Sequence, residues 1–285
     1  MSISNHPATW KQPMTQSIFN DYSTFPLPQT NRHNVYLDGP KSHTSQPIVT
    51  GTSVIGIKYD KGVMIAADNL GSYGSLARFS DIQRLHPLGK HTLIGVAGDM
   101  ADYQWLKKKL DALLREEDSL SLTDSHPSLS SSNIYTLLAN LFYGRRSKVD
   151  PVWNALLVGG WDTSKKEPQR ANFYRFLAYV DLLGTTYSAP TLATGFGAHL
   201  AQPLLREAYE AKAGINGEGP LLTAEEAESL LNECMKVLFY RDARSINKYQ
   251  VATITEQGIN ISDSKSASTE WGFAEGLRGY GAQVQ

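Results

Sequence analysis

The order in which strand-like and helix-like segments follow one another constrains the fold of this chain more than any other feature of its sequence. Short apolar runs typical of strands are found at residues 54–59, 63–67, 92–97, 154–161, 173–180 and 249–255. Apolar stripes at helical spacing are found at residues 100–115, 134–142, 198–211 and 223–240. Strands and pairs of helices come in separate groups, which favours an α+β fold with antiparallel sheets inside and helices outside over a Rossmann-type alternation.

Polar residues and glycines mark the expected ends of two of these helices. Thr223 is followed three residues later by Glu226, which is the spacing of a capping box. In the second helix, residues 131–133 are candidate N-caps and Gly144 is a candidate C-cap. Cys234 lies on the apolar stripe of the last helix, and we therefore expect it to be a core residue.

The composition excludes several classes of function. The 285 residues include 27 basic and 28 acidic ones, so no excess of positive charge supports binding to nucleic acid or to a membrane surface. A single cysteine cannot form an intrachain disulfide, which favours a reducing compartment. No apolar stretch approaches the roughly 20 residues of a membrane span. The seven histidines do not occur in pairs at ligand spacing, and we expect neither a metal nor a cofactor.

The first 43 residues differ in character from the rest of the chain. They contain five of the 13 prolines, few charges and no persistent apolar pattern, and they match neither a secretory signal nor a mitochondrial presequence. Composition alone favours a disordered tail over a removable pro-segment. We therefore divide the chain into an N-terminal segment at residues 1–43, a folded domain at 44–262 and a C-terminal extension at 263–285.

Residues 51–68, with the sequence GTSVIGIKYDKGVMIAAD, resemble the mature start of proteasome beta subunits. In that family a threonine preceded by glycine opens the first strand, and an aspartate ends the second. The resemblance covers about residues 44–255 and includes matches at 95–99, 194–197 and 240–245. Segments similar to the class of beta subunit in the seventh ring position are found at 46–54, 67–75 and 190–199. The resemblance implies an N-terminal nucleophile hydrolase fold, a four-layer αββα sandwich of two antiparallel sheets flanked by helices.

The resemblance also implies a set of site residues. In catalytic members the threonine hydroxyl, here that of Thr52, attacks the peptide carbonyl, and the α-amine of the same threonine takes the proton. An α-amine is a base near neutral pH and a peptide nitrogen is not, so this mechanism needs the bond between Gly51 and Thr52 to be cut. The other positions that match the family are Asp68, the oxyanion-hole glycine Gly98, and the polar pair Asp242 and Ser245.

Two positions depart from the family pattern and indicate a vestigial site. Arg84 stands where the family has a lysine, and arginine stays protonated while its planar fork needs different partners and more room. Phe196 replaces a serine whose hydroxyl takes part in the hydrogen bonding of the site. The sequence therefore favours a non-catalytic, structural beta subunit, and the alternative is an active threonine endopeptidase with Thr52 as its nucleophile.

The resemblance further implies partners, processing and a location. Proteasome beta subunits assemble with alpha subunits into a particle with two seven-membered rings of each kind, which serves ATP- and ubiquitin-dependent protein degradation in the cytoplasm and nucleus. Beta subunits of this class lose most of their N-terminal extension, so a pro-segment becomes the preferred interpretation of residues 1–43. We expect cleavage near His43 and Thr44, which leaves the nitrogen of Thr52 acylated.

The C-terminal extension contains three aromatic residues, Trp271, Phe273 and Tyr280, among small and polar ones. Aromatic side chains are enriched in interfaces, and in the family this extension contacts the opposite beta ring. The sequence leaves open whether the three side chains contact a neighbouring subunit or fold back onto their own domain.

Overall fold

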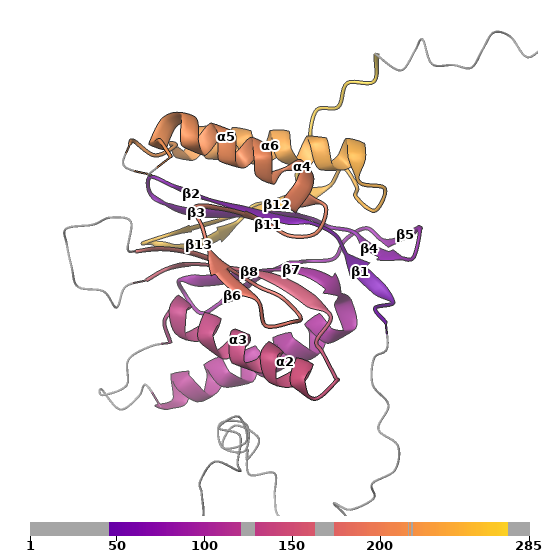
Figure 1. Cartoon of the computed structure of the whole chain (residues 1–285), viewed down its shortest axis with the longest axis vertical. Coiled ribbons are helices and arrows are strands. Elements are labelled where there is room, and N and C mark those ends of the chain that lie inside the picture. The colour runs from indigo at the N-terminus through magenta and orange to yellow at the C-terminus, as the bar shows by residue number, and fades with distance from the viewer. Residues whose placement is uncertain (1–45, 121–128, 163–173, 216, 218, 273–285) are drawn as a thin grey trace, which may run out of the picture.

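The fold is a sandwich of four layers, with two β-sheets between two layers of helices (Figure 1). The structure is a computed structural model that describes residues 46–120, 129–162, 174–215, 217 and 219–272 of the chain. All strand pairs in both sheets are antiparallel within these ranges. The predicted α+β class and the αββα layering are confirmed.

The larger sheet, sheet A, has eight strands within the described residues. Its spatial order is β10-β9-β8-β7-β1-β4-β5, and β6 also pairs with β7. The strands are β1 (Val49–Gly51), β4 (Gly71–Tyr73), β5 (Leu76–Phe79), β6 (Leu85–Leu88), β7 (Thr92–Asp99), β8 (Asn154–Trp161), β9 (Arg175–Val180) and β10 (Thr186–Ser188). Two helices, α2 (Met100–Leu120) and α3 (Ser131–Ser147), cover its outer face.

The smaller sheet, sheet B, has five strands within the described residues. In spatial order they are β11 (Thr191–Ala193), β2 (Val54–Tyr59), β3 (Gly62–Asp68), β12 (Tyr249–Thr255) and β13 (Gly258–Ile261). The helices over its outer face are α4 (Gly197–Leu200), α5 (Gln202–Ala213) and α6 (Ala224–Arg241).

Three apolar cores fill the spaces between the layers. The core between the sheets includes Val54, Ile65 and Leu157, all fully buried. The core between sheet A and its helices is built around Phe142. The core between sheet B and its helices includes Cys234, which confirms the prediction made from the stripe of the last helix. Burial raises the pKa of the Cys234 thiol to about 12, so this thiol is a packing group at neutral pH.

The long elements agree with the sequence predictions, and the capping box is present. The hydroxyl of Thr223 accepts a hydrogen bond from the Glu226 backbone N–H at 3.3 Å, and the Glu226 carboxylate accepts one from the Thr223 N–H at 2.7 Å. Together they satisfy two of the N–H groups that the first turn of a helix leaves without partners.

The structure corrects the prediction of one helix at residues 198–211. This segment forms two helices, α4 and α5, that meet at Ala201. Pro203 in the first turn of α5 has no N–H to donate, so the backbone ladder of α4 cannot continue through it.

The predicted ends of α3 are also wrong. Its N-cap is Ser130, whose hydroxyl accepts a hydrogen bond from the Asn133 N–H at 3.3 Å, and not one of residues 131–133. At the other end the helix continues to Ser147, because the Lys148 N–H still donates to carbonyls of the last turn. Gly144 therefore lies buried inside the helix and is not a C-cap.

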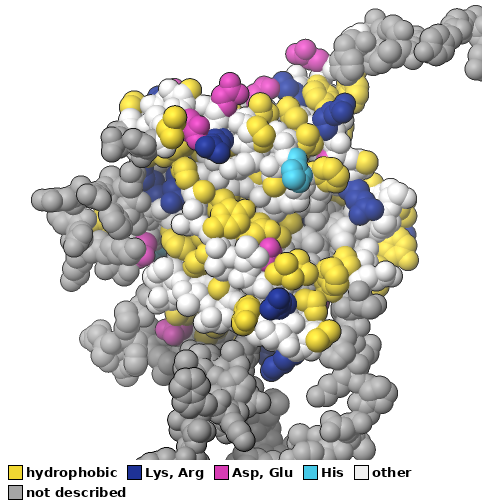
Figure 2. Space-filling model, viewed as in Figure 1, with side chains coloured by type: hydrophobic (Ala, Val, Ile, Leu, Met, Phe, Trp, Pro, Cys, Tyr) yellow, Lys and Arg dark blue, Asp and Glu magenta, His cyan; other side chains and the backbone are white. Residues whose placement is uncertain are grey.

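Several predictions fall outside the described residues. They concern the N-terminal segment at 1–43, the cleavage position at His43 and Thr44, and the aromatic residues Phe273 and Tyr280. Within the described ranges, no helix is both long enough and apolar enough to cross a membrane. On the face shown in Figure 2, basic and acidic side chains are interspersed among apolar ones.

Candidate functional site

The candidate site lies where the chain passes from sheet A to sheet B. Strand β1 lies between β7 and β4, with Gly51 opposite Gly98 and Thr50 opposite both Asp99 and Ser72. Strand β2 then begins in the other sheet at Val54. The two residues between these strands carry the chain across the sandwich, and the first of them is Thr52.

The hydroxyl of Thr52 is held by an acidic residue far away in the sequence. It donates a hydrogen bond of 2.5 Å to Oδ2 of Asp242, which is the C-cap of helix α6. The other carboxylate oxygen of Asp242 accepts the Arg244 backbone N–H at 2.9 Å. Ser245 contributes through its backbone, since its N–H donates to the Asp242 carbonyl at 3.2 Å. The end of α6 thus presents a fixed carboxylate to the Thr52 hydroxyl.

Arg84 fills the interior of the site and is 1% exposed. Its guanidinium donates to the Asp68 carboxylate and to the Thr52 carbonyl. It also donates to three further backbone carbonyls, those of Ser53 at 3.0 Å, Val96 at 3.0 Å and Asp68 at 3.4 Å. The planar fork of arginine therefore links the connection before β2, the end of β3 and the middle of β7.

The electrostatics of this buried pair follow from its burial and its hydrogen bonds. Burial raises the pKa of the Asp68 carboxyl, and the charge of Arg84 and a hydrogen bond from the Ile246 N–H counteract part of that rise. Burial lowers the pKa of Arg84, and Asp68 opposes that change. Because a guanidinium starts from so high a pKa, it remains a cation, and it offers no lone pair that could take a proton from the Thr52 hydroxyl.

Two glycines are required by the close packing of the site. A Cβ on Gly51 would overlap the Nε atom of Arg84. Gly98 has a φ of +96°, which favours glycine, and a Cβ there would overlap the Trp153 carbonyl. Gly98 lies beside the chain that leads to Thr52, and Gly51 is its strand partner.

The segment around Phe196 is attached to the site by its backbone. The Gly197 N–H donates to the Ser53 hydroxyl at 2.8 Å. The neighbouring Thr194 is tied to Val54 twice, by its N–H and by its side-chain oxygen, both at 2.8 Å. The Phe196 side chain is itself 59% exposed, at the start of α4. The polar contacts of this segment come from Ser53 and Thr194, two residues that the sequence analysis did not single out.

The structure thus brings five of the predicted residues into one connected group, which Ser245 joins through its backbone N–H. Thr52 joins Asp242, and Arg84 joins Asp68 and the backbone of Thr52. Among the described residues, no group of three or more His, Cys, Asp or Glu side chains could hold a metal ion. What the group can do chemically depends on the nitrogen of Thr52, which is a peptide nitrogen while Gly51 precedes it.

Comparison with known proteins gives the family. A model of the family described as proteasome subunit matches residues 48–254. The chain belongs to the proteasome subunit family. Its relatives include the probable proteasome subunit beta type-7 of Schizosaccharomyces pombe, 48% identical over 247 residues, which cover 87% of this chain and 88% of the relative. The beta type-4 subunit of Xenopus laevis is 47% identical, with 85% of this chain and 92% of the relative covered. The beta type-7 subunit of Saccharomyces cerevisiae is 43% identical, with 98% and 99% covered.

These relatives are all proteasome beta subunits, which confirms the resemblance seen in residues 51–68. Membership of the proteasome family also places the chain in the N-terminal nucleophile hydrolase superfamily, in agreement with its four-layer fold. The family forms a threonine protease complex, and the chain is a beta subunit of that family.

The first aromatic residue of the C-terminal extension contacts helix α6 in this proteasome subunit. The Trp271 ring lies edge-on to the rings of Tyr240 and Phe239, with centroids 5.3 and 6.2 Å away. The Glu270 N–H donates to the Tyr240 hydroxyl at 2.7 Å, which fixes the chain just before the ring. Even so, Trp271 is 52% exposed. Both interpretations of this residue therefore have support, because one part of the ring packs on its own domain and the rest faces solvent.

Proposed function

We propose that this beta subunit is a non-catalytic, structural component of the 20S proteasome core particle. In this proposal it supports the assembly of the rings, and it serves ATP- and ubiquitin-dependent protein degradation in the cytoplasm and nucleus only through the complete particle. The observation that carries the proposal is the position of β1, the strand immediately before Thr52, inside sheet A.

Strand β1 argues against a free N-terminal threonine because it is part of the sheet. It pairs on one side with β7 and on the other with β4, and the Ile48 N–H just before it donates to the Asp99 carboxylate at 3.1 Å. A strand with two partners keeps its backbone groups satisfied only while it stays in place. It also occupies the position between β4 and β7 where an extended peptide would otherwise pair beside Gly98.

Arg84 supports the same proposal from the chemical side. Its donors are taken up by one carboxylate and several backbone carbonyls, as expected of a group that organises structure. Since it stays protonated, it cannot alternate between charged and neutral forms as a buried lysine can. The position that the family fills with a lysine is therefore occupied by a fixed cation.

The alternative is an active threonine endopeptidase, and one observation favours it. The Thr52 hydroxyl is already hydrogen-bonded to the Asp242 carboxylate, and Asp68 is held in place by Arg84. A hydroxyl positioned by a carboxylate is one part of an activated nucleophile. The missing part is a free α-amine, which only cleavage between Gly51 and Thr52 would provide.

The state of that bond in the assembled particle distinguishes the two candidates. We would purify the particle, sequence the N-terminus of this subunit and measure its intact mass. A start near Thr44 supports the structural proposal, because the nitrogen of Thr52 is then acylated. A start at Thr52 contradicts it and supports the endopeptidase.

An independent test compares the peptidase activities of particles that carry Thr52→Ala or Thr52→Ser. A structural subunit predicts that all peptidase activities of the particle remain close to wild type in both variants. An active subunit predicts that Thr52→Ala abolishes one activity and that Thr52→Ser, which keeps a hydroxyl, retains part of it. Native electrophoresis of each particle checks that assembly is unchanged.

The proposed partners are the alpha and beta subunits of two seven-membered rings of each kind, with residues 263–285 contacting the opposite beta ring. The half-exposed Trp271 supports an interface there, because large aromatic side chains are favoured interface anchors. Deletion from Trp271 onward is expected to hinder the joining of half-particles and to leave the fold of the domain intact. Wild-type yields of the double ring from the truncated chain would contradict this assignment, and fractionation of cells would test the proposed location.

A further inference from the structure

A cavity of about 550 Å³ lies at the opposite end of β2 from Thr52. One wall is the segment from Ser188 to Thr191, which connects the edge strand of sheet A to the edge strand of sheet B. Helix α5 provides the facing wall, and Ile215 and Leu221 add apolar side chains. The length of β2, which rises by about 3.3 Å per residue, separates this cavity from the site around Thr52. The two are therefore distinct.

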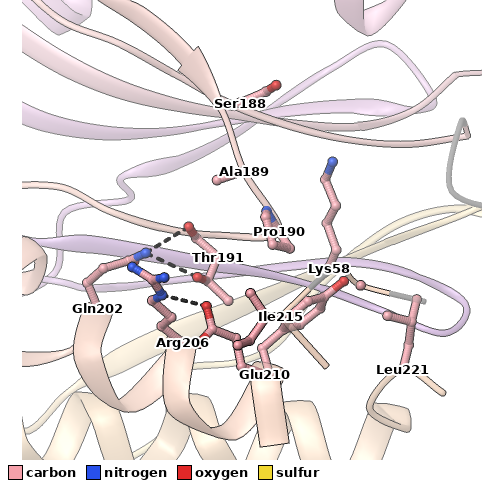
Figure 3. Close-up of a pocket in the computed structure, with 12 residues that line it drawn as sticks. Lys58, Ser188, Ala189, Pro190, Thr191, Gln202, Arg206, Glu210, Ile215 and Leu221 are labelled. Atoms are coloured by element: carbon pink, nitrogen blue, oxygen red, sulfur yellow. Dashed lines mark hydrogen bonds and ion pairs between the residues drawn. The ribbon is translucent and has the colours of Figure 1, made fainter. Parts of the chain in front are cut away.

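Lys58 is the lysine that lines this cavity, and its backbone is fixed. It lies on β2 opposite Val63, and its N–H donates to the Pro190 carbonyl at 2.8 Å. Its strand neighbours Ile57 and Tyr59 pack toward the helices, so the alternation of the strand directs Lys58 to the other face. Figure 3 shows its side chain extending away from helix α5, beside Pro190.

No carboxylate in the described part of the chain forms an ion pair with Lys58. Among the described residues that line the cavity, the acidic one, Glu210, is paired with Arg206 at 2.5 Å. Four other lysines, Lys212, Lys236, Lys248 and Lys265, are each paired with a carboxylate. Lys58 is half-buried and lacks that compensation.

The environment of Lys58 favours its neutral amine. Burial, and then the nearby cation Arg175, lower its pKa to about 8. Arg175 is held in place by hydrogen bonds to the carbonyls of Tyr59 and Asp60, at 2.7 and 2.6 Å. At pH 7 an amine with this pKa is neutral about 300 times as often as one with the ordinary value of 10.5. The other ionisable groups among the described residues that line the cavity are Arg206, Tyr209 and Glu210, all from α5.

We propose that Lys58 is a covalent modification site, at which the side-chain amine accepts a short acyl group from a small acyl thioester. The neutral nitrogen attacks the thioester carbonyl, the C–S bond breaks, the thiolate leaves and the extra proton of the nitrogen passes to solvent. The product is an uncharged amide. Acylation therefore removes a half-buried cation that has no carboxylate partner in the described structure, and the acyl chain lies beside Pro190, which lines the cavity.

The test measures how fast Lys58 is acylated in the assembled particle. The particle is incubated at pH 7 with acetyl-coenzyme A, and the acetylated fraction at each lysine is followed by peptide mass spectrometry. Lys61 is the internal reference, because it is exposed and lies in the turn directly after β2. We expect Lys58 to react at least about tenfold faster than Lys61. This factor is smaller than the gain of about 300-fold in neutral amine, because the cavity restricts the access of acetyl-coenzyme A to Lys58. Equal or slower reaction at Lys58 would overturn the proposal.

A pair of variants tests whether the acyl donor reaches Lys58 through the cavity. Ile215→Trp narrows the cavity at a side chain that is 85% exposed, so the fold is unaffected, and it is expected to slow acetylation of Lys58 at least about threefold without changing that of Lys61. Val149→Trp is the matched control, because Val149 is also 85% exposed and does not line the cavity. A rate at Lys58 that is indifferent to Ile215→Trp would exclude the cavity as the binding site of the acyl donor.

Discussion

Replacement of Arg84 by methionine tests whether its guanidinium is a structural group. Methionine is also long and unbranched, but it has no charge and donates no hydrogen bond. The substitution removes the ion partner of Asp68 and leaves several carbonyls at the centre of the sandwich without their side-chain donor. The Asp68 carboxylate would remain buried with only the Ile246 N–H to stabilise its charge.

The expected loss of stability follows from this burial. Arg84 and Asp68 are each 1% exposed, so solvent does not screen their interaction appreciably. Removing one partner of a buried ion pair costs about 3–5 kcal/mol, because the other charge is left uncompensated. We therefore expect Arg84→Met to lower the free energy of unfolding at pH 7.5 by about 3–5 kcal/mol.

The loss should also depend on pH, with a defined sign. Burial raises the pKa of folded-state Asp68 and Arg84 limits that rise, so removing Arg84 raises this pKa further. A carboxyl group with a raised pKa in the folded state takes up a proton on folding. The resulting stability is complete below the pKa of the unfolded state and is lost as the pH rises through the folded-state pKa. The penalty of Arg84→Met should therefore be smaller at pH 5 than at pH 7.5.

Denaturant unfolding of the full chain, followed by tryptophan fluorescence at both pH values, measures these quantities. Arg78→Met is the control, because Arg78 is exposed and its removal should change the free energy of unfolding by no more than about 0.5 kcal/mol. Adding Asp68→Asn to Arg84→Met removes the unpaired charge and should recover part of the stability. A loss below about 1 kcal/mol, or a loss that is the same at both pH values, would refute the structural role.

Three further predictions follow from the fold. Gly98→Ala should destabilise the chain by more than about 2 kcal/mol, because φ is positive and a Cβ would overlap a backbone carbonyl. Gly74→Ala should cost about 1 kcal/mol, because φ is also positive there but the space around the Cβ is open. Thermal unfolding of the two variants compares these losses. Thr223→Ala removes the N-cap of α6 and should cost about 1 kcal/mol, measured in the same way. Cys234, whose pKa is about 12, should resist alkylation at pH 8 in the native chain and react after unfolding, as mass spectrometry would show.

The longer elements could be predicted from the sequence because their signals are local. Strands β3, β7 and β8 are apolar runs of seven or eight residues, and α6 carries both an apolar stripe and a capping box. The strands that the sequence analysis missed include β1, β4, β10 and β11, each of three residues. So short a segment shows no periodicity, and it becomes a strand only because a distant partner pairs with it. The break between α4 and α5 has a local signal in Pro203, but the apolar stripe at residues 198–211 continues through it.

The candidate site could be predicted from the sequence only through the family resemblance. Thr52 and Asp242 are 190 residues apart, and no local pattern links them. The resemblance identified Arg84 as a departure, but its hydrogen bonds to carbonyls of β3, of β7 and of the connection before β2 depend on how the sheets stack. It also assigned Phe196 to the place of a hydroxyl, whereas the polar contacts there come from Ser53 and Thr194.

The pairing of β1 has a consequence for local unfolding. Within the described residues, strand β5 pairs only with β4, and β4 is connected to the rest of sheet A only through β1. These three strands should therefore open as one cooperative unit, with a common rate of amide hydrogen exchange that exceeds the rate in β7 and β8. Any protein that binds the exposed Tyr73, Leu76 and Phe79 of the β4–β5 hairpin would slow this opening. It would thereby protect the bond before Thr52 from proteolysis without touching it.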